Sequence, residues 1–132
     1  MSLAELKQLS NLSQGDIDHL KGICYKDCQP IGDHLFYKGR DDQKYAQTSF
    51  KFRGRLFQMR KAQLSLFLKL KDIDFDMNTW DETLSTSHLC HRKSCLEKEH
   101  LHLETYEHNR ERDECARARR CVGHKEMPKC IV

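Results

Sequence analysis

The chain has 132 residues, of which 38% are hydrophobic and 33% charged, and its formal net charge is +3. This is the length of a single domain, and the apolar share lies below the ~45–50% of ordinary globular domains, which argues against a large apolar core. The sequence contains no apolar run of about 18 residues, so we expect no membrane-spanning helix and no membrane partner.

The cysteines are the first indication of what stabilises the fold of so polar a chain. There are seven cysteines, an odd number that cannot all pair within one chain. The first residues carry no basic segment followed by an apolar one, so we expect no signal peptide and a reducing, intracellular environment. Metal binding is therefore the expected use of the cysteines, and a secreted disulfide protein is the minor alternative.

The N-terminal part, residues 1–48, is expected to form two short helices and then a loop. Within residues 2–23, apolar side chains recur at helical spacing, with a polar interruption at residues 10–15. Residues 24–48 contain several glycines and Pro30, which is typical of a loop with short strands.

The middle part, residues 49–85, is expected to form a basic strand and a helix. Residues 49–57 alternate, which predicts one strand with Phe50, Phe52 and Leu56 on one side. The other side then carries Lys51, Arg53 and Arg55. Residues 60–71 fit both periods, but their Leu, Lys, Gln and Ala content favours a helix. An acidic connector follows at residues 72–82.

The C-terminal part, residues 86–132, holds six of the eight histidines and five of the seven cysteines. Thiolates and imidazoles at short spacings suit tetrahedral zinc. The sequence therefore predicts two structural zinc ions. The first set of ligands is Cys90, Cys95 and His100, with a fourth to be found, and the second set is Cys115, Cys121, His124 and Cys130.

The residues between these ligands resemble a known family. The string Ser87-His88-Leu89-Cys90-His91, then Cys95, His100-Leu101 and Asn109 before Cys115, resembles the His-Me finger (ββα-metal, HNH-like) nucleases. The resemblance is to their zinc-bound homing endonucleases, and it covers residues 86–130, more loosely back to about residue 34. One departure is Lys98-Glu99, where the family has Asn-Pro.

The resemblance implies roles for particular residues. His88 falls on the family's general base, and Asn109 on the ligand of a catalytic Mg²⁺ or similar divalent ion. The basic residue that neutralises the scissile phosphate falls on Arg55, with Arg53 as the alternative. The basic strand, with Lys51, Arg53, Arg55 and Arg60, would then contact double-stranded DNA, and the arginines of residues 110–120 would contact its backbone at most.

The fourth ligand of the first zinc also comes from the resemblance. Tyr37-Lys38-Gly39 and Lys44-Tyr45 match the family's frame, in which His34 occupies the position of a cysteine. Imidazole is a competent zinc ligand. Cys28 and then Cys24 are the alternatives, because both lie just upstream.

Taken together, we expect one α+β domain over residues 1–132, with a small ββα-metal nuclease fold, an antiparallel sheet and two zinc-bound loops. The function expected from the resemblance is a DNA endonuclease that leaves 5′-phosphate and 3′-hydroxyl ends. The alternative is a zinc-bound DNA- or protein-binding module whose catalysis has decayed. The resemblance also allows a homodimer, and a nuclear location in a eukaryote.

Overall fold

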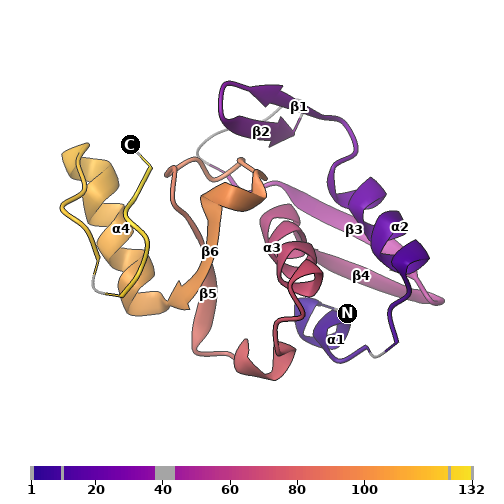
Figure 1. The fold of residues 1–132 in the computed structure, drawn as a ribbon. Helices are drawn as coiled ribbons and strands as arrows, with labels where there is room; N and C mark the ends of the chain where they lie inside the picture. Colours follow the sequence, from indigo (N-terminus) through magenta and orange to yellow (C-terminus); the bar gives the residue numbers. More distant parts are fainter. Residues whose placement is uncertain (1, 10, 38–43, 125, 132) are drawn as a thin grey trace.

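A computed structural model describes residues 2–9, 11–37, 44–124 and 126–131 (Figure 1). Lys38 and Gly39, which belong to the family frame, lie outside the described residues. The elements follow in the order α1 (Leu3–Lys7), α2 (Gln14–Cys24), β1 (Cys28–Ile31), β2 (His34–Tyr37), β3 (Gln47–Phe52), β4 (Arg55–Arg60), α3 (Lys61–Asp72), η1 (Met77–Thr79), β5 (Leu84–His88), η2 (Lys98–His100), β6 (Leu101–Thr105) and α4 (Tyr106–Ala118).

The described strands form three two-stranded antiparallel sheets, β1–β2, β3–β4 and β5–β6. In each sheet the two strands are consecutive in the chain. The connection between β5 and β6 is long, and it carries three of the predicted zinc ligands. Helix α4 follows β6 directly, so that β5, β6 and α4 form the predicted ββα unit, and the α+β fold class is confirmed. None of the described helices is long and apolar enough to cross a membrane.

Helix α3 is the centre of the apolar core. Ala62, Leu64 and Leu66–Leu68 are almost fully buried, because α1, α2, β4 and β6 surround the helix. Figure 1 shows α3 between the β3–β4 hairpin and the β5–β6 pair. The core of the described residues extends only to Leu101, with Leu103 packed against it. Helix α4 and the C-terminal segment are therefore held by something other than apolar packing.

The prediction of one strand over residues 49–57 is wrong, because the chain reverses direction at Arg53 and Gly54. Both residues have positive φ values of 50° and 74°, which is the geometry of a tight two-residue hairpin turn. The reversal places Phe57 opposite Phe50, and both are buried. Leu56, which was expected on the buried side, pairs with Lys51 on the outer face and is 49% exposed.

Candidate active site and metal centres

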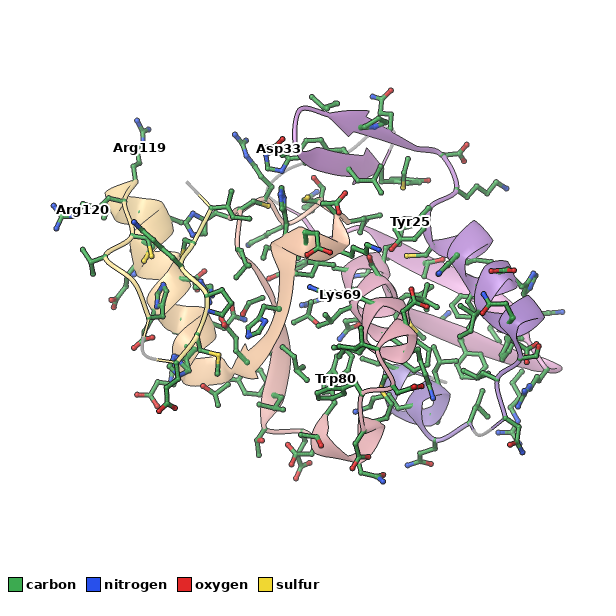
Figure 2. All side chains as sticks on the ribbon, viewed as in Figure 1. Tyr25, Asp33, Lys69, Trp80, Arg119 and Arg120 are labelled. Carbon is green, nitrogen blue, oxygen red and sulfur yellow. The ribbon has the colours of Figure 1, made fainter. Side chains whose placement is uncertain are left out.

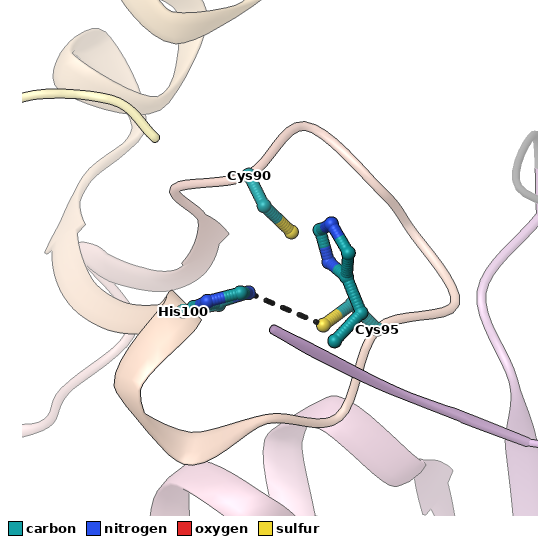
Figure 3. A group of neighbouring side chains, drawn as sticks. Cys90, Cys95 and His100 are labelled. Atoms are coloured by element: carbon teal, nitrogen blue, oxygen red, sulfur yellow. Dashed lines mark hydrogen bonds between the residues drawn. The ribbon is translucent and has the colours of Figure 1, made fainter. Parts of the chain in front are cut away.

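The first metal cluster joins the end of the β5–β6 unit to the N-terminal part of the chain. His34 begins β2, Cys90 and Cys95 lie in the loop after β5, and His100 ends η2. The ligand atoms of these four side chains all lie within 4.8 Å of one another. Figure 3 shows Cys90, Cys95 and His100 pointing toward one common space. The predicted ligands therefore meet at one point.

The separations within this cluster fit a tetrahedral zinc ion. With Zn–S and Zn–N bonds of about 2.3 and 2.0 Å, a tetrahedral angle puts sulfur and nitrogen about 3.5 Å apart. The Sγ atom of Cys95 lies 3.6 Å from Nδ1 of His100. The Nδ1 atom of His34 is buried and has no hydrogen-bond partner among the described residues, as expected for a nitrogen that faces a metal.

The two alternative cysteines lie outside this cluster. The thiol of Cys24 is fully buried at the end of α2 and donates to the carbonyl of Lys61 at 3.5 Å. Burial raises the pKa of Cys24 to about 12, so it stays a neutral core side chain. The thiol of Cys28 lies 3.9 Å from the carbonyl of Cys24. The structure thus brings His34 together with the three C-terminal ligands. Neither of the two alternative cysteines belongs to this cluster.

The second metal cluster connects α4 to the C-terminal segment. Cys115 lies on α4, and its three partners follow the helix. The Nε2 atom of His124 lies 3.6, 3.3 and 3.3 Å from the sulfur atoms of Cys115, Cys121 and Cys130. These are again close to the sulfur–nitrogen edges of a tetrahedral zinc site.

Groups around the second metal cluster also suit bound zinc. The backbone N–H groups of Gly123 and Cys130 both donate to Sγ of Cys121 at 3.4 Å. Burial opposes ionisation of Cys121, but these two bonds lower its pKa to about 6, which favours the thiolate that zinc requires. A carboxylate oxygen of Glu111 lies 3.4 Å from the other ring nitrogen of His124, a typical partner of a metal-bound imidazole.

A small pocket lies where β4, β5 and α4 meet. Its volume is about 150 Å³, and its polar lining includes Tyr45, Arg60, Ser85, Thr86, His88 and Asn109. His88 and Asn109, two of the three residues to which the resemblance assigns a catalytic role, therefore share one cavity. We call this cavity the β5–α4 pocket.

His88 is held as a neutral imidazole with one defined tautomer. Its Nε2 atom lies 3.1 Å from the carbonyl oxygen of Cys95. Since a carbonyl can only accept, Nε2 carries the proton and Nδ1 keeps a free lone pair. Burial is the main reason that the pKa of His88 falls to about 4, and the nearby charges of Arg60 and Lys93 lower it further. The imidazole is therefore uncharged at pH 7 and able to accept a proton.

Asn109 lies one turn into α4, which begins at the cap formed by Thr105. The hydroxyl of Thr105 accepts from the backbone N–H of His108 at 3.2 Å. The side-chain NH₂ of Asn109 donates to the hydroxyl of Ser85 at 3.3 Å. Because the amide nitrogen is used in this way, the amide oxygen remains as a hard ligand for a divalent cation. The buried hydroxyl of Thr86, which lines the same pocket, has no hydrogen-bond partner among the described residues.

Among the basic residues of the hairpin, the structure places Arg60 in the β5–α4 pocket and Arg55 away from it. Arg55 begins β4 and Arg60 ends it, and a strand of six residues spans roughly 17 Å. Arg53, the alternative, sits in the turn and pairs with Asp16 of α2 at 3.0 Å. Arg60, rather than Arg55, therefore lines the pocket together with His88 and Asn109, and the phosphate-contacting role expected of Arg55 remains a prediction.

The basic residues of α4 and of the segment that follows it differ in exposure. Arg119 and Arg120 project from the end of the helix into solvent (Figure 2). Arg112, by contrast, is 2% exposed and donates to both carboxylate oxygens of Glu104 at 2.6 and 2.8 Å. It also donates to the carbonyl of Pro128 and to Sγ of Cys130, so it connects α4, β6 and the second metal cluster. No sequence signal distinguishes it from its exposed neighbours.

A comparison with known proteins agrees with this geometry. Residues 38–131 match the family model described as the zinc-binding loop region of homing endonuclease. No curated protein and no solved structure shows significant similarity to the chain. The family model spans more than half of the chain, and both metal clusters lie largely within the matched residues. The chain therefore belongs to the family defined by the zinc-binding loop region of homing endonucleases.

Proposed function

We propose that this chain is a metal-dependent endonuclease that hydrolyses phosphodiester bonds of double-stranded DNA, leaving 5′-phosphate and 3′-hydroxyl ends. The observation that supports it is the β5–α4 pocket, which holds a neutral imidazole, an amide oxygen and a guanidinium within one cavity. Hydrolysis of a phosphodiester needs a group that takes the proton of water, a cation for the leaving oxygen and positive charge for the phosphate. Each of these three needs has a residue in the pocket.

His88 would be the general base. Its Nδ1 lone pair would take a proton from the attacking water, while the carbonyl of Cys95 holds the ring through Nε2 and stabilises the positive charge that the ring acquires. This carbonyl belongs to a residue of the first metal cluster, so a bound zinc would fix the position of the base.

Asn109 would hold the catalytic divalent ion through its amide oxygen. One protein ligand suits Mg²⁺, which keeps most of its waters and readily uses substrate phosphate oxygens. When bound, such an ion supplies charge stabilisation for the leaving 3′ oxygen. Asn109 itself is oriented by its hydrogen bond to Ser85, which uses the amide nitrogen and not the oxygen.

Arg60 would contact the scissile phosphate, since it is the guanidinium that lines the β5–α4 pocket. The rest of the hairpin would lie along the DNA. Its outer face pairs Gln47 with Arg60, Ser49 with Gln58, and Lys51 with Leu56. A two-stranded ribbon fits the major groove, where glutamine amides hydrogen-bond base edges and lysine contacts phosphate.

The test is nicking of supercoiled plasmid and of a pool of random-sequence duplexes by zinc-loaded protein, with and without Mg²⁺. The parent is expected to cut only with the divalent ion, and His88→Ala is expected to lose cleavage while it keeps two zinc ions. His19→Ala is the matched control, since His19 is exposed on α2.

Cleavage by His88→Ala at the parental rate would refute the assignment of the base. Protein that binds duplex DNA but leaves both substrates intact would support the alternative, a binding module without catalysis. A mixture of substrates is needed because an enzyme with a rare target would leave a single plasmid uncut.

A further inference from the structure

The aromatic ring of Tyr45, which lines the β5–α4 pocket, has two cationic side chains as neighbours. The guanidinium carbon of Arg60 is 3.9 Å from the ring centroid, and Nζ of Lys93 is 5.4 Å from it. The ring of His88 is also a neighbour, with 5.8 Å between the two centroids. These residues come from separate places, namely the segment before β3, the end of β4, the loop after His91, and the end of β5.

Two features set this arrangement apart from an ordinary surface contact. Cations are attracted to the face of an aromatic ring, and an arginine at this distance stacks on tyrosine. Neither Arg60 nor Lys93 has a carboxylate partner among residues 44–124 or the other described ranges. A carboxylate would neutralise the two charges, whereas an aromatic ring fixes their positions and leaves them available to an anion.

Hydrogen bonds already hold the backbone of Arg60 in place, so only the position of its side chain depends on a further contact. Arg60 pairs with Gln47 in the hairpin, and its N–H donates to the side chain of Gln63 at 3.1 Å. Arginine has a long, flexible side chain whose free rotation would carry the guanidinium away from the pocket. Stacking on Tyr45 removes this freedom before the substrate binds.

We propose that Tyr45 is a positioning residue that holds Arg60 and Lys93 beside His88, and that Lys93 is a second cation for the phosphate at the cleavage site. This inference rests on the proposed nuclease function. It adds a phosphate contact from the loop that carries the first metal cluster, so the phosphate would be held by two cations that both neighbour Tyr45.

The test measures single-turnover cleavage with protein in excess, for Tyr45→Leu, Tyr45→Phe, Arg60→Ala and the Tyr45→Leu/Arg60→Ala double variant. Tyr45→Leu is expected to slow cleavage at saturating protein about fivefold or more, while the zinc content and the Tm stay near those of the parent. Tyr45→Phe keeps the ring face and is expected to restore most of the rate. In the Arg60→Ala background, Tyr45→Leu is expected to cost much less than alone.

Lys93→Ala extends the test, with Lys26→Ala as its matched control, since Lys26 is exposed and lines a different cavity. Lys93→Ala is expected to slow cleavage severalfold, and Lys26→Ala is not. Cleavage by Tyr45→Leu at the parental rate, or losses that multiply in the double variant, would overturn the inference.

A structural readout separates this inference from the proposed function. Protons of Arg60 that lie over the Tyr45 ring are expected to resonate upfield, and the NMR shift is expected to disappear in Tyr45→Leu. If the parent does not cleave DNA at all, the proposed function fails and the catalytic role fails with it. If the parent cleaves but no upfield shift is seen, only the positioning role of Tyr45 is refuted.

Discussion

Replacing Arg112 by methionine is expected to destabilise the fold more than any change of a neighbouring charged residue. Arg112 fills a buried position between α4, β6 and the C-terminal segment. Its four contacts are two hydrogen bonds to Glu104, one to the carbonyl of Pro128 and one to Sγ of Cys130. Methionine has a similar length but can make none of them.

The expected loss in the free energy of unfolding follows from the state in which the variant leaves Glu104. Glu104 is fully buried, so the variant leaves its carboxyl group without a cation to pair with, and breaking one side of such a pair costs about 3–5 kcal/mol. For a chain of this size this corresponds to a fall in Tm of roughly 10 °C or more. The double variant Glu104→Gln/Arg112→Met removes the unpaired charge and should recover about 2 kcal/mol.

Thermal unfolding of zinc-loaded protein at constant free zinc measures these differences. Arg110→Met on the exposed side of the same helix is the control and should lie within about 0.5 kcal/mol of the parent. An effect of Arg112→Met below about 1 kcal/mol, or a double variant no more stable than the single one, would refute the reasoning.

Acidification provides a second check on the same pair. Burial of Glu104 opposes its ionisation, but the hydrogen bonds from Arg112 prevail and lower its pKa below 4.5. A lowered native pKa stabilises the fold above pH 4.5, and this contribution disappears as the pH falls below it. In Arg112→Met the carboxyl can be neutral, so the difference from the parent should shrink between pH 7 and pH 4.

Three further changes test the rest of the structure. His34→Ala should reduce the zinc content from two ions to one, whereas Cys28→Ser should keep both; equal loss in both variants would contradict the ligand assignment. Phe57→Ala should cost about 3–5 kcal/mol in chemical denaturation, because Phe57 is fully buried against Phe50, and a cost below 1 kcal/mol would contradict this packing. Ser13→Ala should cost about 1 kcal/mol, since Ser13 caps α2 through Asp16, with Ser2→Gly as a comparison at the shorter α1.

The sequence predicted those parts of the molecule whose determinants are local. The helix expected at residues 60–71 forms at Lys61–Asp72, as its Leu, Lys, Gln and Ala content favours, whereas the ββα unit was implied by the family resemblance. The two metal clusters were predictable because ligands close in the chain, such as Cys90 and Cys95, reach one centre without knowledge of the fold. His34 needed the family pattern, since it approaches from a distant hairpin.

The errors have a common physical origin in long-range geometry. A two-residue turn at Arg53 and Gly54 interrupts a strand without breaking its alternation, so the pattern continued past the true end of β3. The hairpin also brings Arg60, at the end of β4, to the lining of the β5–α4 pocket, which the expected single strand did not indicate. Glu104 and Arg112 were also unpredictable as a pair, because a buried ion pair between a strand and a helix looks like ordinary surface charge in sequence.

The residue that follows His88 links the two metal clusters. The N–H of Leu89 donates to the carbonyl of His100, a ligand of the first cluster, and the carbonyl of Leu89 accepts from Ile131, which follows the last ligand of the second, both at 2.8 Å. Most of the apolar core lies N-terminal to this region, between Leu3 and Trp80, and only Leu96 and Leu101 of its buried residues come from the part of the chain that follows His88. Metal depletion should therefore loosen the C-terminal third as a separate cooperative unit, and the proposed catalysis would disappear at metal concentrations at which most of the helical core still persists.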